Sequence, residues 1–160
     1  MNEDEEIPES VVKSAKIKAD SMAKIFAHIG VDAVNIGETD LVLGIPVLKE
    51  IEKQWDFPFI SANLVDASGS PVFQRYVIKE VAGLKVGIFG LISDASEMVA
   101  NVEKATGGTA RVQDPLEVAA DVVAELAGKV DYVVALAHQK STYDWSLARR
   151  VEGINLIIGG

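Results

Sequence analysis

The chain has 160 residues, of which 49% are hydrophobic and 24% charged, a composition typical of one globular domain. Its formal net charge of −9 argues against a nucleic-acid-binding surface, because such a surface needs clustered basic side chains to neutralise phosphates. The absence of cysteine excludes disulfides and thiolate zinc sites. No run of apolar residues approaches the ~20 that a membrane span requires.

The chain opens with acidic residues, whereas a signal peptide needs a basic and then an apolar segment there. We therefore expect no signal peptide. Residues 1–9 are expected to form an acidic, flexible N-terminus, and residues 10–160 to form the folded domain.

Residues 10–29 are predicted to form an amphipathic helix, with Ser10 as its N-cap and Gly30 as its left-handed stop. Its expected buried face consists of apolar residues spaced three and four apart: Val12, Ala15, Ala19, Met22, Phe26 and Ile29.

The next stretch, VDAVNIGETDL over residues 31–41, predicts a short buried strand followed by a polar loop. The loop sets Glu38, Thr39 and Asp40 side by side directly after the strand. Ligands of open α/β sheets bind at the carboxyl ends of strands. This loop is therefore the first candidate for a functional site.

The middle of the chain predicts a helix over residues 45–55, with Pro46 in its first turn, and a short strand over residues 57–63. Two β-rich runs, residues 72–81 and 84–92, flank Ala82-Gly83 and predict an antiparallel hairpin. Farther along, a short helix is expected around residues 96–104.

The last third predicts a helix that starts with Asp114 as its cap and Pro115 at its first position. A buried strand over residues 130–137 then delivers His138 at its carboxyl end. Ser141 is expected to cap the following helix, with Asp144 as the acid of a capping box, before a final strand. This alternation, with one inserted hairpin, predicts an α/β fold with a largely parallel central sheet.

Two strand ends carry side chains that can bind a metal: Glu38, with Asp40 nearby, and His138. A carboxylate and an imidazole from neighbouring strand ends make half of a typical divalent-metal site. A nucleophilic triad is disfavoured, because the chain has no cysteine and no Gly-x-Ser-x-Gly turn. An unrelated nucleotide-binding module is also disfavoured, because no glycine-rich stretch matches a phosphate-binding loop.

Three segments carry a resemblance to a known family: GVDAVNIGETDL, FPFISANLVDASGSPVFQRYVIKEVAGLKVGIFGLI and DYVVALAHQKSTYDWSLARRVEGINLIIGG. In this order and spacing they resemble the metallophosphoesterase (calcineurin-like) domain of the 5′-nucleotidase/UDP-sugar hydrolase family. The resemblance covers nearly all of residues 19–160. It implies part of a metallophosphatase α/β sandwich.

The resemblance also implies a two-metal hydrolase that acts on nucleotide or sugar-nucleotide phosphate bonds, in the periplasm or outside the cell. By position, His138 matches a metal-ligand histidine, and Glu38 stands where the family has a ligand asparagine. Thr39 stands where the family has the histidine that stabilises phosphoryl transfer.

Other ligand segments of the family lie upstream and downstream of the matched stretch and are absent from this chain. We therefore expect a domain truncated at both ends, with an incomplete two-metal site and no efficient catalysis by the isolated chain. Exposed sheet edges are expected to pair with a second copy. The alternative is a non-catalytic binding or structural descendant of the fold, because Glu38-Thr39 replaces the family's Asn-His.

Overall fold

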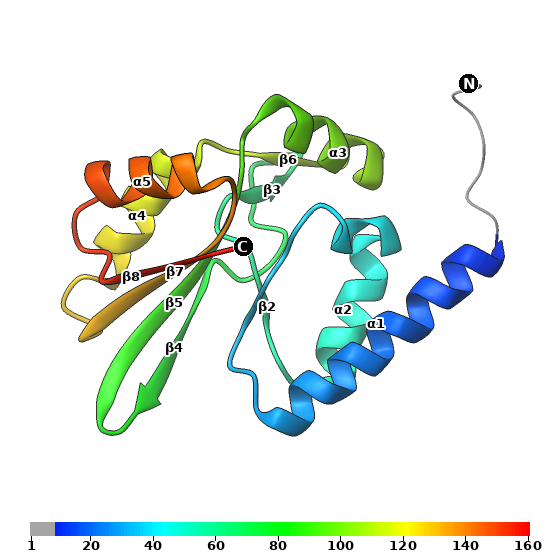
Figure 1. Cartoon of the computed structure of the whole chain (residues 1–160), viewed down its shortest axis with the longest axis horizontal. Helices are drawn as coiled ribbons and strands as arrows, with labels where there is room; N and C mark the ends of the chain where they lie inside the picture. The colour runs from blue at the N-terminus through cyan, green and yellow to red at the C-terminus, as the bar shows by residue number, and fades with distance from the viewer. Residues whose placement is uncertain (1–8) are drawn as a thin grey trace.

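The computed structural model describes residues 9–160, and side chains from residue 13 on (Figure 1). Its helices are α1 (Glu9–Ile29), η1 (Asp40–Leu43, a 3₁₀ helix), α2 (Ile45–Trp55), α3 (Ser96–Thr106), α4 (Pro115–Leu126) and α5 (Ser141–Arg150). Its strands are β1 (Val34–Asn35), β2 (Phe59–Ile60), β3 (Leu64–Asp66), β4 (Tyr76–Val81), β5 (Leu84–Ile92), β6 (Ala110–Val112), β7 (Tyr132–His138) and β8 (Leu156–Gly159).

The main sheet has the strand order β4-β5-β7-β8, in which β5, β7 and β8 run parallel and β4 is antiparallel to β5. The β4–β5 turn consists of Ala82 and Gly83, both with positive φ (52° and 81°), as tight hairpin turns require. Strands β1 and β2 form a separate parallel pair, and β3 and β6 an antiparallel pair. The predicted α/β fold with a largely parallel sheet and an inserted hairpin is confirmed.

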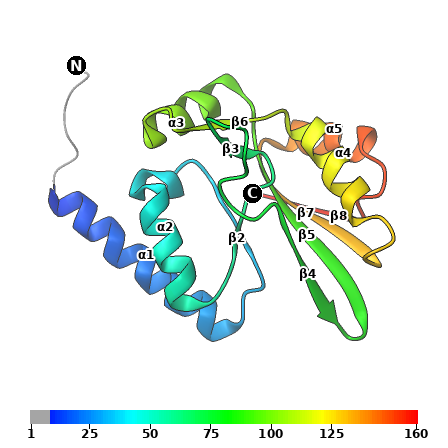
Figure 2. The same ribbon diagram turned by 180° about the vertical axis from the view of Figure 1, so that it is seen from behind.

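Helices α4 and α5 cover one face of this sheet (Figures 1 and 2). On that face Phe89, Ala135 and Leu126 are fully buried. Leu126 lies so close to the sheet that a Cβ on Gly87 would come within 2.8 Å of it. At the other face, β1 contacts β5 and β7. Strand β5 is apolar almost throughout because its carboxyl half is buried on both sides.

A second hydrophobic cluster joins α1, α2, α3 and η1. Within it, Phe26, Phe57, Phe59 and Phe73 form a chain of edge-to-face contacts, with ring centroids 5.2–6.2 Å apart. The Trp55 indole N–H donates to Asp20 Oδ1 at 2.9 Å and ties α2 to α1.

The buried face predicted for the first helix is partly wrong. Ala23 is buried there, whereas Met22 and Ile29 are 49% and 66% exposed. The buried side of α1 is set by its neighbour α2, a contact that spacing within α1 cannot reveal. Residues 1–8, most of the expected flexible N-terminus, and the side chains of Ser10 and Val12 lie outside the described residues.

Other boundaries differ in detail. Asp114 caps α4 as predicted, and its carboxylate accepts from two backbone N–H groups. Ser141, however, is the first residue of α5 and makes no capping bond, while Asp144 accepts from the Gln139 side chain. Strand β6 was not predicted, because its three residues pair with a strand more than 40 positions upstream. Within residues 9–160, no helix is long and apolar enough to cross a membrane.

Candidate functional site

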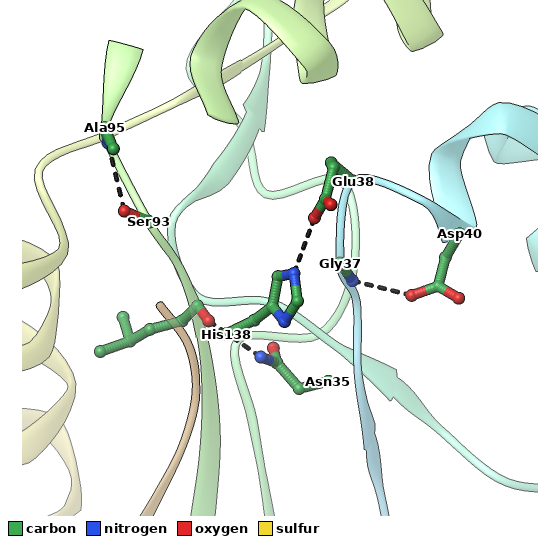
Figure 3. Close-up of polar contacts among 8 residues, drawn as sticks. Asn35, Gly37, Glu38, Asp40, Ser93, Ala95 and His138 are labelled. Carbon is green, nitrogen blue, oxygen red and sulfur yellow. Dashed lines mark hydrogen bonds and ion pairs between the residues drawn. The ribbon is translucent and has the colours of Figure 1, made fainter. Parts of the chain in front are cut away.

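The loop after β1 is held by a hydrogen bond between its own backbone and one of its side chains. The Gly37 N–H donates to Asp40 Oδ2 at 2.8 Å, which turns the chain into η1 and directs Glu38 toward β7 (Figure 3). Gly37 is buried beside the ring of His138, and a Cβ on it would come within 3.1 Å of two ring atoms. The glycine therefore permits the close approach of the loop to His138.

His138 is the last residue of β7, and its ring meets Glu38 (Figure 3). His138 Nε2 lies 2.7 Å from Glu38 Oε2, and the two side chains are 36% and 20% exposed. The main chain of His138 is fixed as well, because its carbonyl accepts from the Ser93 N–H at 3.0 Å. The structure thus brings together the two residues that the sequence singles out, 100 positions apart.

Asp40 lies close to this pair but points back to its own loop (Figure 3). Burial raises the pKa of its carboxyl above the ordinary value of 3.8, and the hydrogen bond from the Gly37 N–H partly opposes that shift. Thr39 is exposed and makes no capping bond at the start of η1.

The residues at the site do not fit a complete metal centre. Among residues 9–160, no group of three His, Cys, Asp or Glu side chains is placed to hold a metal ion. Glu38 and His138 are two donors, whereas protein sites for divalent ions such as zinc use three or four ligands. In this chain the carboxylate and the ring nitrogen contact one another instead.

A pocket of about 480 Å³ opens beside the pair, between the N-terminal ends of α3 and α5. Its lining residues are Glu38, Ser93, Ala95, Glu97, Met98, Asn101, His138, Gln139, Lys140, Ser141 and Gly160. Sequence reasoning missed the α3 side of this pocket, because Met98 and Asn101 look like ordinary residues of a surface helix. The pocket gives a small molecule access to Glu38 and His138.

Two asparagines, Asn63 and the partly buried Asn35, support the site from behind. Asn63 is fully buried, and its amide bonds the Ile92 N–H, the Ile92 carbonyl and the Gln113 carbonyl. Asn35 donates to the Leu91 carbonyl at 2.8 Å, which fixes β1 against β5 (Figure 3). Both side chains act on the backbone rather than on a ligand.

Comparisons with known proteins agree with this fold. No model of a known protein family matches the chain. The 5′-nucleotidase of Vibrio cholerae is 31% identical over 170 residues, which cover 96% of this chain and 30% of that protein. The calcineurin-like phosphoesterase YfkN from Bacillus subtilis has a TM-score of 0.77 at 27% identity, covering 95% of this chain and 53% of that one. The 5′-nucleotidase precursor from Thermus thermophilus has a TM-score of 0.74 at 30% identity, covering 94% and 29%.

In fold and sequence, the chain resembles the calcineurin-like phosphoesterase YfkN and the 5′-nucleotidase precursor. Its curated relatives include proteins named 5′-nucleotidase, and the resemblance found in its sequence motifs is confirmed. The chain spans about 30% of the length of the curated 5′-nucleotidases that it matches.

Proposed function

We propose that this chain is a phosphoesterase-type domain that contributes Glu38 and His138 as ligands to a divalent-metal centre. Its substrates would be nucleotide phosphates, as the name 5′-nucleotidase of its relatives suggests, or sugar-nucleotide phosphates, as the resemblance of its motifs implies. The observation that supports this proposal best is that the fold brings a carboxylate, Glu38, and an imidazole, His138, together beside a pocket, where β1 and β7 end. Open α/β sheets bind their ligands at such ends.

We also propose that the chain by itself is not an efficient enzyme. It supplies two metal ligands where a stable site needs more. Thr39 stands at the position of the family histidine, and a hydroxyl cannot donate a proton at neutral pH as an imidazolium does. With millimolar Mn²⁺ or Mg²⁺, we expect no turnover of AMP, UDP-glucose or an aryl phosphate above the buffer rate. Turnover typical of enzymes, about 1 s⁻¹ or more, would contradict this part.

Metal binding can be tested without an activity assay. The chain has two histidines, and His28 lies exposed at the end of α1, so it serves as an internal control. Paramagnetic Mn²⁺ is expected to broaden the NMR signals of the His138 ring well before those of His28. Glu38→Gln should shift that titration to higher Mn²⁺ concentration. Equal broadening of both rings would rule out His138 as a ligand.

A non-catalytic binding domain is the second candidate. It is favoured by the direct pairing of Glu38 with His138, which leaves neither group free in this structure. The discriminating variant is Thr39→His, tested with AMP and Mn²⁺. A large gain in rate over the unaltered protein would indicate an eroded enzyme, whereas absence of turnover in both would favour the binding domain.

A further inference from the structure

A small cavity of about 70 Å³ lies between the loop after β5 and the N-terminal parts of α4 and α5. Its polar lining residues are Asp94, Asp114, Gln139, Tyr143 and Ser146, and its other lining residues are apolar. We term it the Gln139 cavity. Pockets that take drug-sized molecules measure roughly 300–1,000 Å³. The Gln139 cavity is therefore too small for a nucleotide and has the size to hold an ion or a few waters.

Gln139 brings a buried oxygen without a partner to this cavity. The residue is 8% exposed, and its Nε2 donates to Asp144 Oδ1 at 2.9 Å. Its Oε1 is buried and has no hydrogen-bond partner among the residues that the structure describes. Leaving a buried carbonyl oxygen unpaired costs free energy, and nearly all such atoms in folded proteins are paired. The Oε1 atom therefore indicates that a hydrogen-bond donor or a cation binds there.

The other polar groups of the cavity are oxygens that can bind a cation. Asp114 uses Oδ1 to accept from the first N–H groups of α4, and its second carboxylate oxygen remains for a ligand. The Ser146 hydroxyl donates to the Thr142 carbonyl at 3.2 Å, so its lone pairs also remain as acceptors. No basic side chain is among the lining residues, and the two carboxylates make the cavity negative. Asp94 and Asp114 are both exposed, which gives an ion access from solvent.

We propose that the Gln139 cavity is a calcium site, formed by the carboxylates of Asp94 and Asp114, the Gln139 carbonyl oxygen and waters. Calcium takes roughly six to eight oxygen ligands in flexible geometry, and amide carbonyls and waters count among them. It therefore does not need a group of three His, Cys, Asp or Glu side chains, which residues 9–160 do not provide. The positive N-terminal ends of α4 and α5 oppose a cation, so we expect a Kd on the order of 10⁻⁴–10⁻³ M.

The Gln139 cavity is separate from the Glu38–His138 pair. Neither Glu38 nor His138 lines it, and Gln139 is the one lining residue that it shares with the larger pocket beside the pair. Its ligands are oxygens only, which suit calcium, whereas an imidazole also suits transition-metal ions. Magnesium demands near-octahedral geometry and gives up its waters reluctantly, so it should bind this cavity more weakly than calcium. The calcium site is thus independent of the proposed function.

The test is isothermal titration calorimetry with Ca²⁺, together with NMR of the Gln139 side-chain amide. We expect saturable binding, with the Gln139 amide signals shifting in parallel with the heat. Asp94→Asn and Asp114→Asn should each weaken Ca²⁺ binding at least tenfold, because each removes a charged ligand. Asparagine caps helices as well as aspartate does, so Asp114→Asn should keep the start of α4 intact. Circular dichroism checks that both variants are folded.

Two controls make the result specific. Asp121→Asn removes the same charge from an exposed position of α4 that does not line the cavity, and it should leave the Ca²⁺ affinity unchanged. Glu38→Gln should also leave the Ca²⁺ affinity unchanged, whereas Asp94→Asn should leave the Mn²⁺ broadening of the His138 ring unchanged. The calcium site and the proposed function can therefore fail separately.

Three outcomes would overturn the calcium site. Absence of saturable binding up to on the order of 10 mM Ca²⁺ would mean that the Gln139 oxygen is paired by water alone. Weakening by Asp121→Asn as large as that by Asp94→Asn would indicate diffuse attraction of Ca²⁺ to an acidic chain. Loss of Ca²⁺ binding in Glu38→Gln would place the ion at the Glu38–His138 pair instead.

Discussion

At the scale of the residue, two side chains that each follow a predicted strand differ in burial and therefore in role. Asn63 and His138 both lie at the carboxyl end of a run predicted as a strand. Asn63 is fully buried, and its side-chain oxygen and nitrogen both form hydrogen bonds with the backbone of Ile92 and Gln113. His138 keeps a third of its side chain exposed and faces a pocket. The sequence could predict the two positions but not which of them is structural.

Asn63 should therefore matter for stability more than Asn35. Asn63→Ala removes three hydrogen bonds, two of them buried, which should cost about 3 kcal/mol. Asn35→Ala removes one bond and also an Oδ1 atom that has no partner, so it should cost about 1 kcal/mol or less. Urea unfolding of the two variants measures both values. Similar losses would refute this ranking.

Asp40 should give the folded state a distinctive dependence on pH. Because burial raises its pKa, the folded chain holds this proton at a pH where the unfolded chain, at about 3.8, has lost it. The stability that Asp40 contributes is therefore fully present below pH 3.8 and falls as pH rises through the raised pKa. Asp40→Asn keeps an acceptor for the Gly37 N–H and removes the charge. Relative to wild type, we expect this variant to gain unfolding free energy from acidic to neutral pH.

Asp66 is the matched control for that titration. A hydrogen bond from the Ser68 side chain, aided by backbone N–H groups of Ser70, Ser68 and Gly69, lowers the pKa of Asp66 below 3.8. Its contribution is present above pH 3.8 and is lost as pH falls through the lowered pKa. Asp66→Asn should thus change relative stability in the opposite direction to Asp40→Asn. Urea denaturation at a series of pH values compares the two, and shifts of equal sign would contradict the assignment.

At the scale of the element, the sequence predicted those helices and turns whose ends are set by residues within the same segment. Residues 45–55 form α2 as predicted, because Gly44 and Pro46 define its start within a few positions. The hairpin turn at Ala82-Gly83 is local in the same sense. The side on which α1 is buried could not be predicted, since it depends on α2 and η1, which come later in the chain. The sequence named Glu38 and His138 as candidate metal ligands but could not predict that the two side chains contact each other directly.

The two predicted helix caps provide a direct comparison of stability. Asp114→Ala removes an acceptor for the Leu116 and Glu117 N–H groups and should destabilise the chain by about 1 kcal/mol. Ser141→Ala should be nearly neutral, because the Ser141 hydroxyl makes no capping bond in α5. Thermal or urea unfolding distinguishes the two. A loss at Ser141 as large as at Asp114 would restore the capping role predicted from the sequence.

At the scale of the whole molecule, one strand links the two hydrophobic clusters. Ile92 at the end of β5 belongs to the cluster of α1, α2 and α3, while Phe89 and Leu91 of the same strand belong to that of α4 and α5. If β5 detaches, both clusters lose buried side chains at the same time. The two halves of the chain should therefore unfold together.

This cooperativity can be measured with one tryptophan. Trp145 is 67% exposed, so Trp145→Phe should be nearly neutral and leaves Trp55, at the end of α2, as the only reporter. In dilute solution, the urea midpoint from Trp55 fluorescence should coincide with that from far-ultraviolet circular dichroism. Two separate midpoints would mean that the α1–α2 half unfolds independently of the sheet.

The contact between Glu38 and His138 also has a consequence for the order of events in folding. Its partners are 100 residues apart in the chain, whereas the β4–β5 hairpin closes over a two-residue turn. Closing a long loop costs more chain entropy than closing a short one, so local pairs form early and distant ones late. The two strand ends can meet only after β5, β7 and β1 are in place. In refolding, the pairing of Glu38 with His138 should therefore be among the last events, so that its formation reports that folding is complete.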